Sequence, residues 1–211
     1  MPGYQNRILR VDLTNHTFRE DSLDKSLIHD FIGGRGFGVK WLYDDLKAGT
    51  DPLGEDNEII FLAGPLAGTP AQSFSRFKIF FKSPLTGTYF MSSGGGFFAA
   101  ELKYAGFDAV VIKGTSEKPV YVWIHNGKYE LRDASYLWGL DCDDTHTLIR
   151  EELRNPRVRL ACIGPAGENG VKFAGVFSDR RAAGRGGGGA VMGAKNLKAV
   201  AVRGDNKVDL S

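Results

Sequence analysis

Glycine is concentrated in three short clusters, and these clusters constrain the fold more than any other feature of the sequence. They lie at residues 33–38, 94–96 and 184–189. Glycine makes up 28 of the 211 residues, about twice the usual fraction of roughly 7%. The clusters have no regular period, and apolar periodic segments flank them, which argues against a fibrous repeat or a flexible linker. Such glycines are typical of tight turns and of backbone that a ligand or another strand approaches closely.

Apolar periodicity predicts a mixture of strands and short helices. Hairpins are predicted within residues 8–19 and 120–132, and the Asn126-Gly127 dipeptide of the second favours a type I′ turn. Helices are predicted at residues 24–32, 37–46, 97–104, 146–153 and 190–195. Further strands are predicted at residues 58–63, 77–81, 109–113, 157–163, 171–177 and 199–203.

The same order of elements occurs twice along the chain. In residues 58–114, and again in residues 157–204, a strand ends at Gly-Pro, and a second strand, a glycine cluster, a short helix and a valine-rich strand follow. Gly-Pro turns and valine strands also recur by chance, but the shared order favours a diverged internal duplication. We therefore predict a single domain over residues 1–211 of class α+β, with two β-sheets related by an internal pseudo-twofold duplication and with short helices. A ligand on the pseudo-twofold axis would contact one glycine turn from each half.

Charge and composition exclude several classes of protein. With 27 basic and 25 acidic side chains the net charge is +2, which argues against a dedicated nucleic-acid-binding protein. No apolar run approaches the roughly 20 residues of a membrane-spanning helix, and the N-terminus shows no signal peptide. Two cysteines, Cys142 and Cys162, cannot supply the four thiolates of an iron–sulfur cluster. We therefore expect a cytoplasmic protein without nucleic-acid or membrane partners.

The glycine cluster at residues 184–189 formally satisfies G-x-G-x-x-G, with Asp205 about 20 residues later. In a dinucleotide-binding fold the first glycine follows a strand directly, whereas here a polar segment intervenes, so this interpretation is disfavoured. Arginines flank the glycine turns instead: Arg180, Arg181 and Arg185 at the second turn, and Arg76 before the first. Guanidinium groups beside exposed backbone N–H groups are typical of phosphate recognition, although each arginine alone is equally compatible with an ordinary surface ion pair. No metal-like histidine spacing or nucleophile motif is present, so the sequence predicts a chain that binds a phosphate-bearing ligand without catalytic residues of its own.

Seven short segments of the sequence, taken together, resemble those of a known protein family. They are NRILRVDL (6–13), FIGGRG (31–36), AGPL (63–66), KSPLTG (82–87), AELKYAGFDA (100–109), IGPAGEN (163–169) and RAAGRGG (181–187). Over about residues 7–204 the chain resembles the N-terminal, tungstopterin-binding domain of the aldehyde ferredoxin oxidoreductase family. The strings are long and occur in order, so the resemblance covers nearly the whole chain.

The resemblance implies a function. Members of the family oxidise aldehydes to carboxylic acids with tungsten, or molybdenum, held by bis-molybdopterin, and pass electrons through a [4Fe-4S] cluster to ferredoxin. In the family, the N-terminal domain is a two-sheet base on which the pterins lie, so the resemblance implies the same role for this chain. The cluster cysteines and the substrate residues belong to later helical domains that this chain lacks, so we expect no catalytic residue and no activity of this chain alone. The resemblance implies that this chain binds those later domains, or a separate subunit that carries them. It also implies ferredoxin as a partner and a homo-oligomer that contains more than one copy of this chain. The alternative is a stand-alone pterin-cofactor carrier, or a split-enzyme subunit, without redox activity of its own.

The resemblance also implies which residues bind the cofactor. Arg76 matches an arginine between the cluster and a pterin, Ser93 and Gly95 match the first pterin turn, and Arg181, Ala182, Ala183 and Gly184 match the second. The backbone carbonyls at the Ser93 and Ala182 positions support a magnesium ion that bridges the pterin phosphates in relatives. The best-known relatives carry asparagine where this chain has Ser93, so only a main-chain contact is carried over there. The glycine-rich segments 94–98 and 184–189 are expected on an exposed face that the cofactor and later domains cover.

Overall fold

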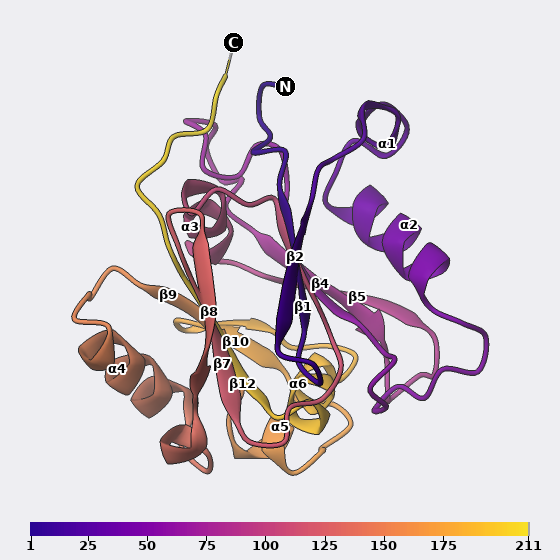
Figure 1. Cartoon of the computed structure of the whole chain (residues 1–211), viewed down its shortest axis with the longest axis vertical. Coiled ribbons are helices and arrows are strands. Elements are labelled where there is room, and N and C mark those ends of the chain that lie inside the picture. The colour runs from indigo at the N-terminus through magenta and orange to yellow at the C-terminus, as the bar shows by residue number, and fades with distance from the viewer. Residues whose placement is uncertain (211) are drawn as a thin grey trace.

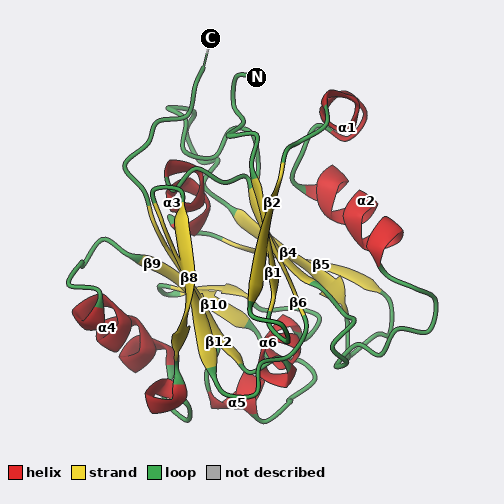
Figure 2. Ribbon diagram, in the orientation of Figure 1, coloured by secondary structure: helices red, strands yellow, loops and turns green. Residues whose placement is uncertain are grey.

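The strands of the chain form two separate six-stranded sheets in the computed structural model, which describes residues 1–210 (Figures 1 and 2). The first sheet has the order β2-β1-β6-β3-β4-β5. Its strands are β1 (Ile8–Asp12), β2 (Thr17–Asp21), β3 (Ile59–Ala63), β4 (Phe77–Lys82), β5 (Tyr89–Gly94) and β6 (Ala109–Lys113). The second sheet has the order β11-β10-β9-β12-β7-β8. Its strands are β7 (Val120–His125), β8 (Lys128–Asp133), β9 (Arg159–Cys162), β10 (Val176–Ser178), β11 (Arg181–Ala183) and β12 (Leu197–Arg203).

Short helices connect and cover the strands. They are α1 (Lys25–Phe31), α2 (Arg35–Asp45), α3 (Phe98–Tyr104), α4 (Cys142–Glu152), α5 (Pro165–Glu168) and α6 (Gly188–Ala194), with a 3₁₀ turn η1 (Ser135–Leu137) before α4. The predicted fold class, an α+β chain with two sheets and short helices, is confirmed. None of these helices, over the described residues, is long and apolar enough to cross a membrane.

The two sheets have the same topology. Read from their hairpin ends, they run β2-β1-β6-β3-β4-β5 and β8-β7-β12-β9-β10-β11. In the first sheet, β6 follows helix α3 and pairs in parallel with β1, the first strand of the hairpin. In the second sheet, β12 follows helix α6 and pairs in parallel with β7 in the same way. The neighbouring pairs with β3 and β9 are antiparallel. The repeats proposed from the sequence cover four strands of each sheet. The strand order that the two sheets share also includes the hairpins β1–β2 and β7–β8.

The sheets pack against each other through one apolar core. Its members include Phe61 and Ile79 of the first sheet and Val122 and Val200 of the second, all fully buried. Helices α3 and α6 contribute to the same core, and each contacts strands of both sheets. Helices α1 and α2 cover the outer face of the first sheet, and α4 covers the outer face of the second (Figure 1). Because both faces of the central strands are covered, all five residues of β3 are buried.

Some predicted elements differ from the structure. The helix predicted at residues 146–153 begins earlier, at Cys142, because Asp141 caps it by accepting a hydrogen bond from the backbone N of Asp144 at 2.9 Å. Of the strand predicted at residues 171–177, only Val176 and Phe177 lie in β10. Residues 172 and 173 form a turn, and residues 171, 174 and 175 have no regular secondary structure. The carbonyl of Ala174 accepts a hydrogen bond from the backbone N of Gly189 at the start of α6. Strands β5 and β11 were not predicted, and both border the expected cofactor site.

Candidate functional site

The two predicted halves of the cofactor site meet where the edge strands of the two sheets lie side by side. Strand β5 is at one edge of the first sheet, β11 is at one edge of the second, and the two strands contact each other. A Cβ atom on Gly95 would lie 3.7 Å from Cγ of Arg181. The backbone N of Arg185 donates a hydrogen bond to Oγ of Ser92 at 3.1 Å. The structure therefore brings the Ser93–Gly95 turn and the Arg181–Gly184 segment into one surface.

The exposure of these residues varies along the two strands. Arg181, Ala182 and Gly184 are exposed and Ala183 is buried, while Ser93 and Gly95 are partly buried. The hydroxyl of Ser93 donates to the carbonyl of Phe77 on the neighbouring strand at 3.3 Å, so this side chain is engaged locally. An edge strand has unpaired backbone groups along one side. Both Ser93 and Ala182 lie on such strands.

Arg76 is exposed and lies immediately before β4. The first residue of β4, Phe77, pairs with Gly94 at the end of β5. The hydroxyl of Ser75 donates to the carbonyl of Gly96 at 2.7 Å and holds the two segments together. Arg76 therefore lies at the same end of β5 as the other predicted residues.

Two further cations at this site were missed by the sequence analysis, Arg35 and Lys78. Lys78 pairs with Ser93 across β4 and β5, and its Cε lies 3.7 Å from the position of a Cβ on Gly34. Burial lowers the pKa of Lys78, and the nearby guanidinium groups of Arg35 and Arg76 lower it further. The available signals were the arginine inside the GGRG string and the single lysine within the apolar run FKIF.

The cations around β5 and β11 have no acidic partners. Six cations make no ion pair with any of residues 1–210. They are Arg35, Arg76, Lys78, Arg180, Arg181 and Arg185. The neighbouring carboxylate of Asp179 is already bound by Arg150 at 2.7 Å and by Arg159 at 3.3 Å. We call these six side chains and the ends of β5 and β11 the edge surface. Guanidinium groups without a carboxylate partner fit a phosphate-bearing group.

The second glycine cluster serves two purposes, and the expectation that all of residues 184–189 are exposed is wrong. Gly184 is exposed, and the nearest atom to a Cβ there would be 3.6 Å away. Residues 186–189 are buried. A Cβ on Gly187 would lie 2.1 Å from the carbonyl oxygen of Lys172, and one on Gly188 would lie 2.7 Å from Cδ1 of Ile79. These glycines are therefore required because the start of α6 packs closely against the backbone of residues 172–175 and against side chains of the first sheet.

The first glycine turn is likewise only partly exposed. Gly94 and Phe98 are buried, Gly95 and Gly96 are intermediate, and Phe97 is 60% exposed. Within the described part of the chain, no group of three or more His, Cys, Asp or Glu side chains has the arrangement of a metal site. Both Cys142 and Cys162 are free thiols.

Comparison with known proteins gives consistent results. A family model described as aldehyde ferredoxin oxidoreductase, N-terminal domain, matches residues 8–204. The whole chain is 46% identical to a tungsten-containing aldehyde ferredoxin oxidoreductase of Pyrococcus abyssi and 45% identical to the one of Pyrococcus horikoshii. It spans about 35% of the length of each of these relatives.

A solved structure is also similar. It is the active site complex BamBC of benzoyl coenzyme A reductase in complex with 1,5-dienoyl-CoA, which matches with a TM-score of 0.97 and 41% identity. The match covers 99% of this chain and 32% of that chain. On the family match and the identity over its whole length, this chain belongs to the aldehyde ferredoxin oxidoreductase family, as an N-terminal domain of that family.

Proposed function

We propose that this chain binds tungsten bis-molybdopterin across the edge surface, as the cofactor-binding part of an oxidoreductase. The observation that carries the proposal is that six cations without an ion pair in the described chain lie on or beside β4, β5 and β11. A cofactor with phosphate groups would neutralise these cations, and charge-assisted hydrogen bonds to phosphate are stronger than those between neutral groups. The tungsten-containing relatives support this choice of cofactor.

Each residue of the site has a distinct proposed role. Arg76 and Arg181 bind the pterins or their phosphates through their side chains, and Gly95 with Ala183 and Gly184 allows the pterins to approach the backbone. The main-chain carbonyls of Ser93 and Ala182 support a magnesium ion between the phosphates. Arg35 and Lys78 add positive charge on the β4 side. The bound metal would supply two-electron redox chemistry, and the residues of this chain would hold and orient it.

The proposed reaction is the oxidation of aldehydes to carboxylic acids with ferredoxin as electron acceptor. Whole-chain identity is higher to the aldehyde enzymes, at 46%, than to the benzoyl-CoA reductase complex, at 41%. Because both kinds of enzyme use this fold, the domain alone does not determine the substrate. A [4Fe-4S] cluster, the substrate residues and the ferredoxin contact would come from other domains or a subunit, and we propose a cytoplasmic homo-oligomer.

Metal and pterin analysis of the protein purified with its bound cofactor tests the proposal. We expect tungsten or molybdenum with two pterins per metal atom, and magnesium bound with them. Charge reversal at the surface, Arg181→Glu, should remove the cofactor, while Arg154→Glu, at an exposed arginine in the turn after α4, should not. A protein that contains no pterin, or that keeps it fully after Arg181→Glu, would contradict the proposal. Tight binding of free metallopterin by this chain alone, without the other domains or a partner subunit, would instead indicate a cofactor carrier.

A further inference from the structure

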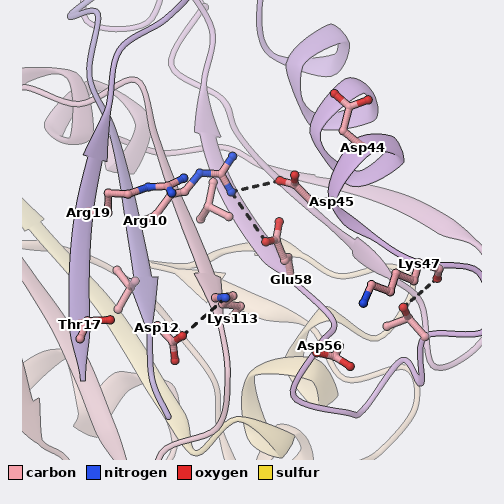
Figure 3. A pocket seen from close by; sticks show the side chains of 13 residues that line it. Arg10, Asp12, Thr17, Arg19, Asp44, Asp45, Lys47, Asp56, Glu58 and Lys113 are labelled. Carbon is pink, nitrogen blue, oxygen red and sulfur yellow. Dashed lines mark hydrogen bonds and ion pairs between the residues drawn. The ribbon is translucent and has the colours of Figure 1, made fainter. Parts of the chain in front are cut away.

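A charged cavity of about 560 Å³ lies on the outer face of the first sheet, towards the edge opposite to β5 (Figure 3). Strands β1, β2 and β6 line it on one side. The C-terminal end of α2 and residues 47–58 line it on the other. No residue of the edge surface takes part. Its volume is in the range of cavities that bind small organic molecules.

The carboxyl group of Glu58 faces this cavity without a hydrogen bond. The side chain is only 8% exposed, and Oε2 is buried with no hydrogen-bond partner among residues 1–210. Oε1 lies 3.8 Å from Nη1 of Arg10, which is beyond hydrogen-bond distance. A buried polar atom without a partner costs about 1–3 kcal/mol. Glu58 is therefore a nearly buried carboxyl group with unused acceptor capacity in the wall of the cavity.

The cations nearest to Glu58 are already engaged by other carboxylates. Nε of Arg10 donates to Asp21 at 2.7 Å, and Nη1 donates to Asp45 at 3.1 Å. Nζ of Lys113 lies 3.6 Å from the carboxylate of Asp12 (Figure 3). Arg10 therefore forms only a long ion pair with Glu58, at 3.8 Å, and shares its charge with two other carboxylates.

The electrostatics of Glu58 agree with this geometry. Burial, followed by the neighbouring charge of Asp45, raises the pKa of Glu58 to about 7. The positive charges of Arg10, Lys113 and Lys195 oppose this rise without cancelling it. A cation bound in the cavity beside the Glu58 carboxylate would favour its ionised form and lower this pKa again.

We propose that the cavity binds a primary ammonium group, with the Glu58 carboxylate as its principal acceptor and Asp56 as a second. Neither carboxylate makes an ion pair closer than 3.8 Å within the described residues, and Asp56 makes none at all. An ammonium group has three donors and no acceptor, which matches the unused acceptor capacity of these carboxyl groups. This site is independent of the cofactor proposed above.

The charge of the cavity favours a cation over an anion. Five carboxylates and four basic groups line it: Asp12, Asp44, Asp45, Asp56 and Glu58 against Arg10, Arg19, Lys47 and Lys113. Three of the basic groups, Arg10, Arg19 and Lys113, are paired with carboxylates. A bare metal ion is disfavoured because no group of three or more suitable ligands occurs among residues 1–210.

Lys47 provides an internal comparison. It lines the same cavity, and its ammonium makes no ion pair with a described residue. Its flexible side chain can compete for the carboxylates, so Lys47→Gln should strengthen the binding of an external ammonium group.

Calorimetric titration of the chain at pH 8 tests the proposal with three probes. The first is n-butylamine, the second is Nα-acetyl-lysine methylamide and the third, n-butanol, is the neutral control. We expect saturable binding of an amine, at least a tenfold loss in Glu58→Gln, and no loss in Glu117→Gln, which changes an exposed carboxylate outside the cavity. The Lys47→Gln variant should bind several times more tightly, which keeps the test valid if Glu58→Gln fails to fold.

The two amines distinguish the source of the ammonium group. Tighter binding of the lysine derivative would indicate a side chain from another polypeptide segment, and tighter binding of n-butylamine would indicate a small free amine; either supports the ammonium site. Equal binding of n-butanol, unchanged affinity in both Glu58→Gln and Lys47→Gln, or no saturable binding of either amine would overturn the proposal.

Discussion

Arg181 lies against Gly95, with its Cγ 3.7 Å from the position that a Cβ on that glycine would occupy. The two residues belong to different sheets and to different halves of the repeated topology. Their contact explains how a chain with two similar halves builds one binding surface. Each sheet contributes one edge strand, β5 from the first and β11 from the second. Gly96, with φ of +93°, completes the turn next to Arg181 and requires a residue without a side chain.

Arg76 and Arg181 should contribute more to cofactor retention than other arginines. In the cofactor-loaded protein, Arg76→Ala and Arg181→Ala should each lower pterin affinity by about 10- to 100-fold, since a hydrogen bond to a charged group contributes on the order of 1.5–3 kcal/mol. Arg181→Lys should rescue only part of this, because an ammonium does not reproduce the planar guanidinium. Tungsten and pterin per polypeptide are the quantities to measure.

The controls separate side-chain from main-chain roles. Ser93→Ala should be mild, because a backbone carbonyl is present in every residue, and Arg154→Ala should have no effect. If Ser93→Ala removes the cofactor while both arginine variants retain it, the assignment of roles is wrong.

Arg35 and Lys78 should be coupled electrostatically in the cofactor-free protein. Arg35→Ala should raise the pKa of Lys78, because one of the two positive charges that lower it is removed. The pKa should remain below its usual value, since burial is the larger cause. NMR titration of the lysine side chain measures this shift, and an unchanged Lys78 pKa would show that Arg35 does not belong to the edge surface.

The glycines of the second cluster should differ sharply in their tolerance of alanine. Gly187 has φ of +84°, and its Cβ would lie 2.1 Å from a backbone oxygen, so Gly187→Ala should destabilise the fold by about 3 kcal/mol or more. Gly184→Ala should change stability by less than about 0.5 kcal/mol, because the nearest atom is 3.6 Å away. Urea denaturation of both variants makes the comparison. Equal destabilisation would show that the cluster is not divided between packing and ligand approach.

Local pattern was sufficient to predict the central strands, the hairpins and most helices, but not the strands that form the site. The β5 sequence YFMSSG ends in small residues, and β11 has only the three residues RAA. Their strand conformation depends on pairing with β4 and β10, which is not a local property. For the same reason Arg35 and Lys78 are close only after folding. Glycines that pack and glycines that face a ligand look identical in sequence, which is why residues 186–189 were misassigned.

The contribution of Glu58 to the stability of the fold should fall as the pH rises from about 4.5 to 7. Its pKa is raised from 4.5 to about 7, so the folded state holds the proton more tightly than the unfolded state. The stability that this proton contributes is complete below pH 4.5 and is lost as the pH rises through 7, in total about 3 kcal/mol. Glu58→Gln should abolish this loss. Urea denaturation at a series of pH values measures this loss in a His146→Phe background, which removes the opposing titration of that histidine. A falling slope that persists after Glu58→Gln is added to this background would contradict the assignment.

His146 should produce the opposite slope over nearly the same range. Burial, and then the charge of Arg150, lower the pKa of His146 from 6.5 to about 4, and its Nε2 is buried without a partner in the described chain. The unfolded state therefore binds the proton more tightly, so stability is complete above pH 6.5 and falls by about 3 kcal/mol as the pH drops through 4. Between pH 4.5 and 6.5 this term and that of Glu58 nearly cancel, so their combined contribution to wild-type stability should change little with pH. His146→Phe should expose the falling slope of Glu58, Glu58→Gln should expose the rising slope of His146, and the double variant should lack both. If either single variant keeps the wild-type profile, the corresponding group is not the source of its slope.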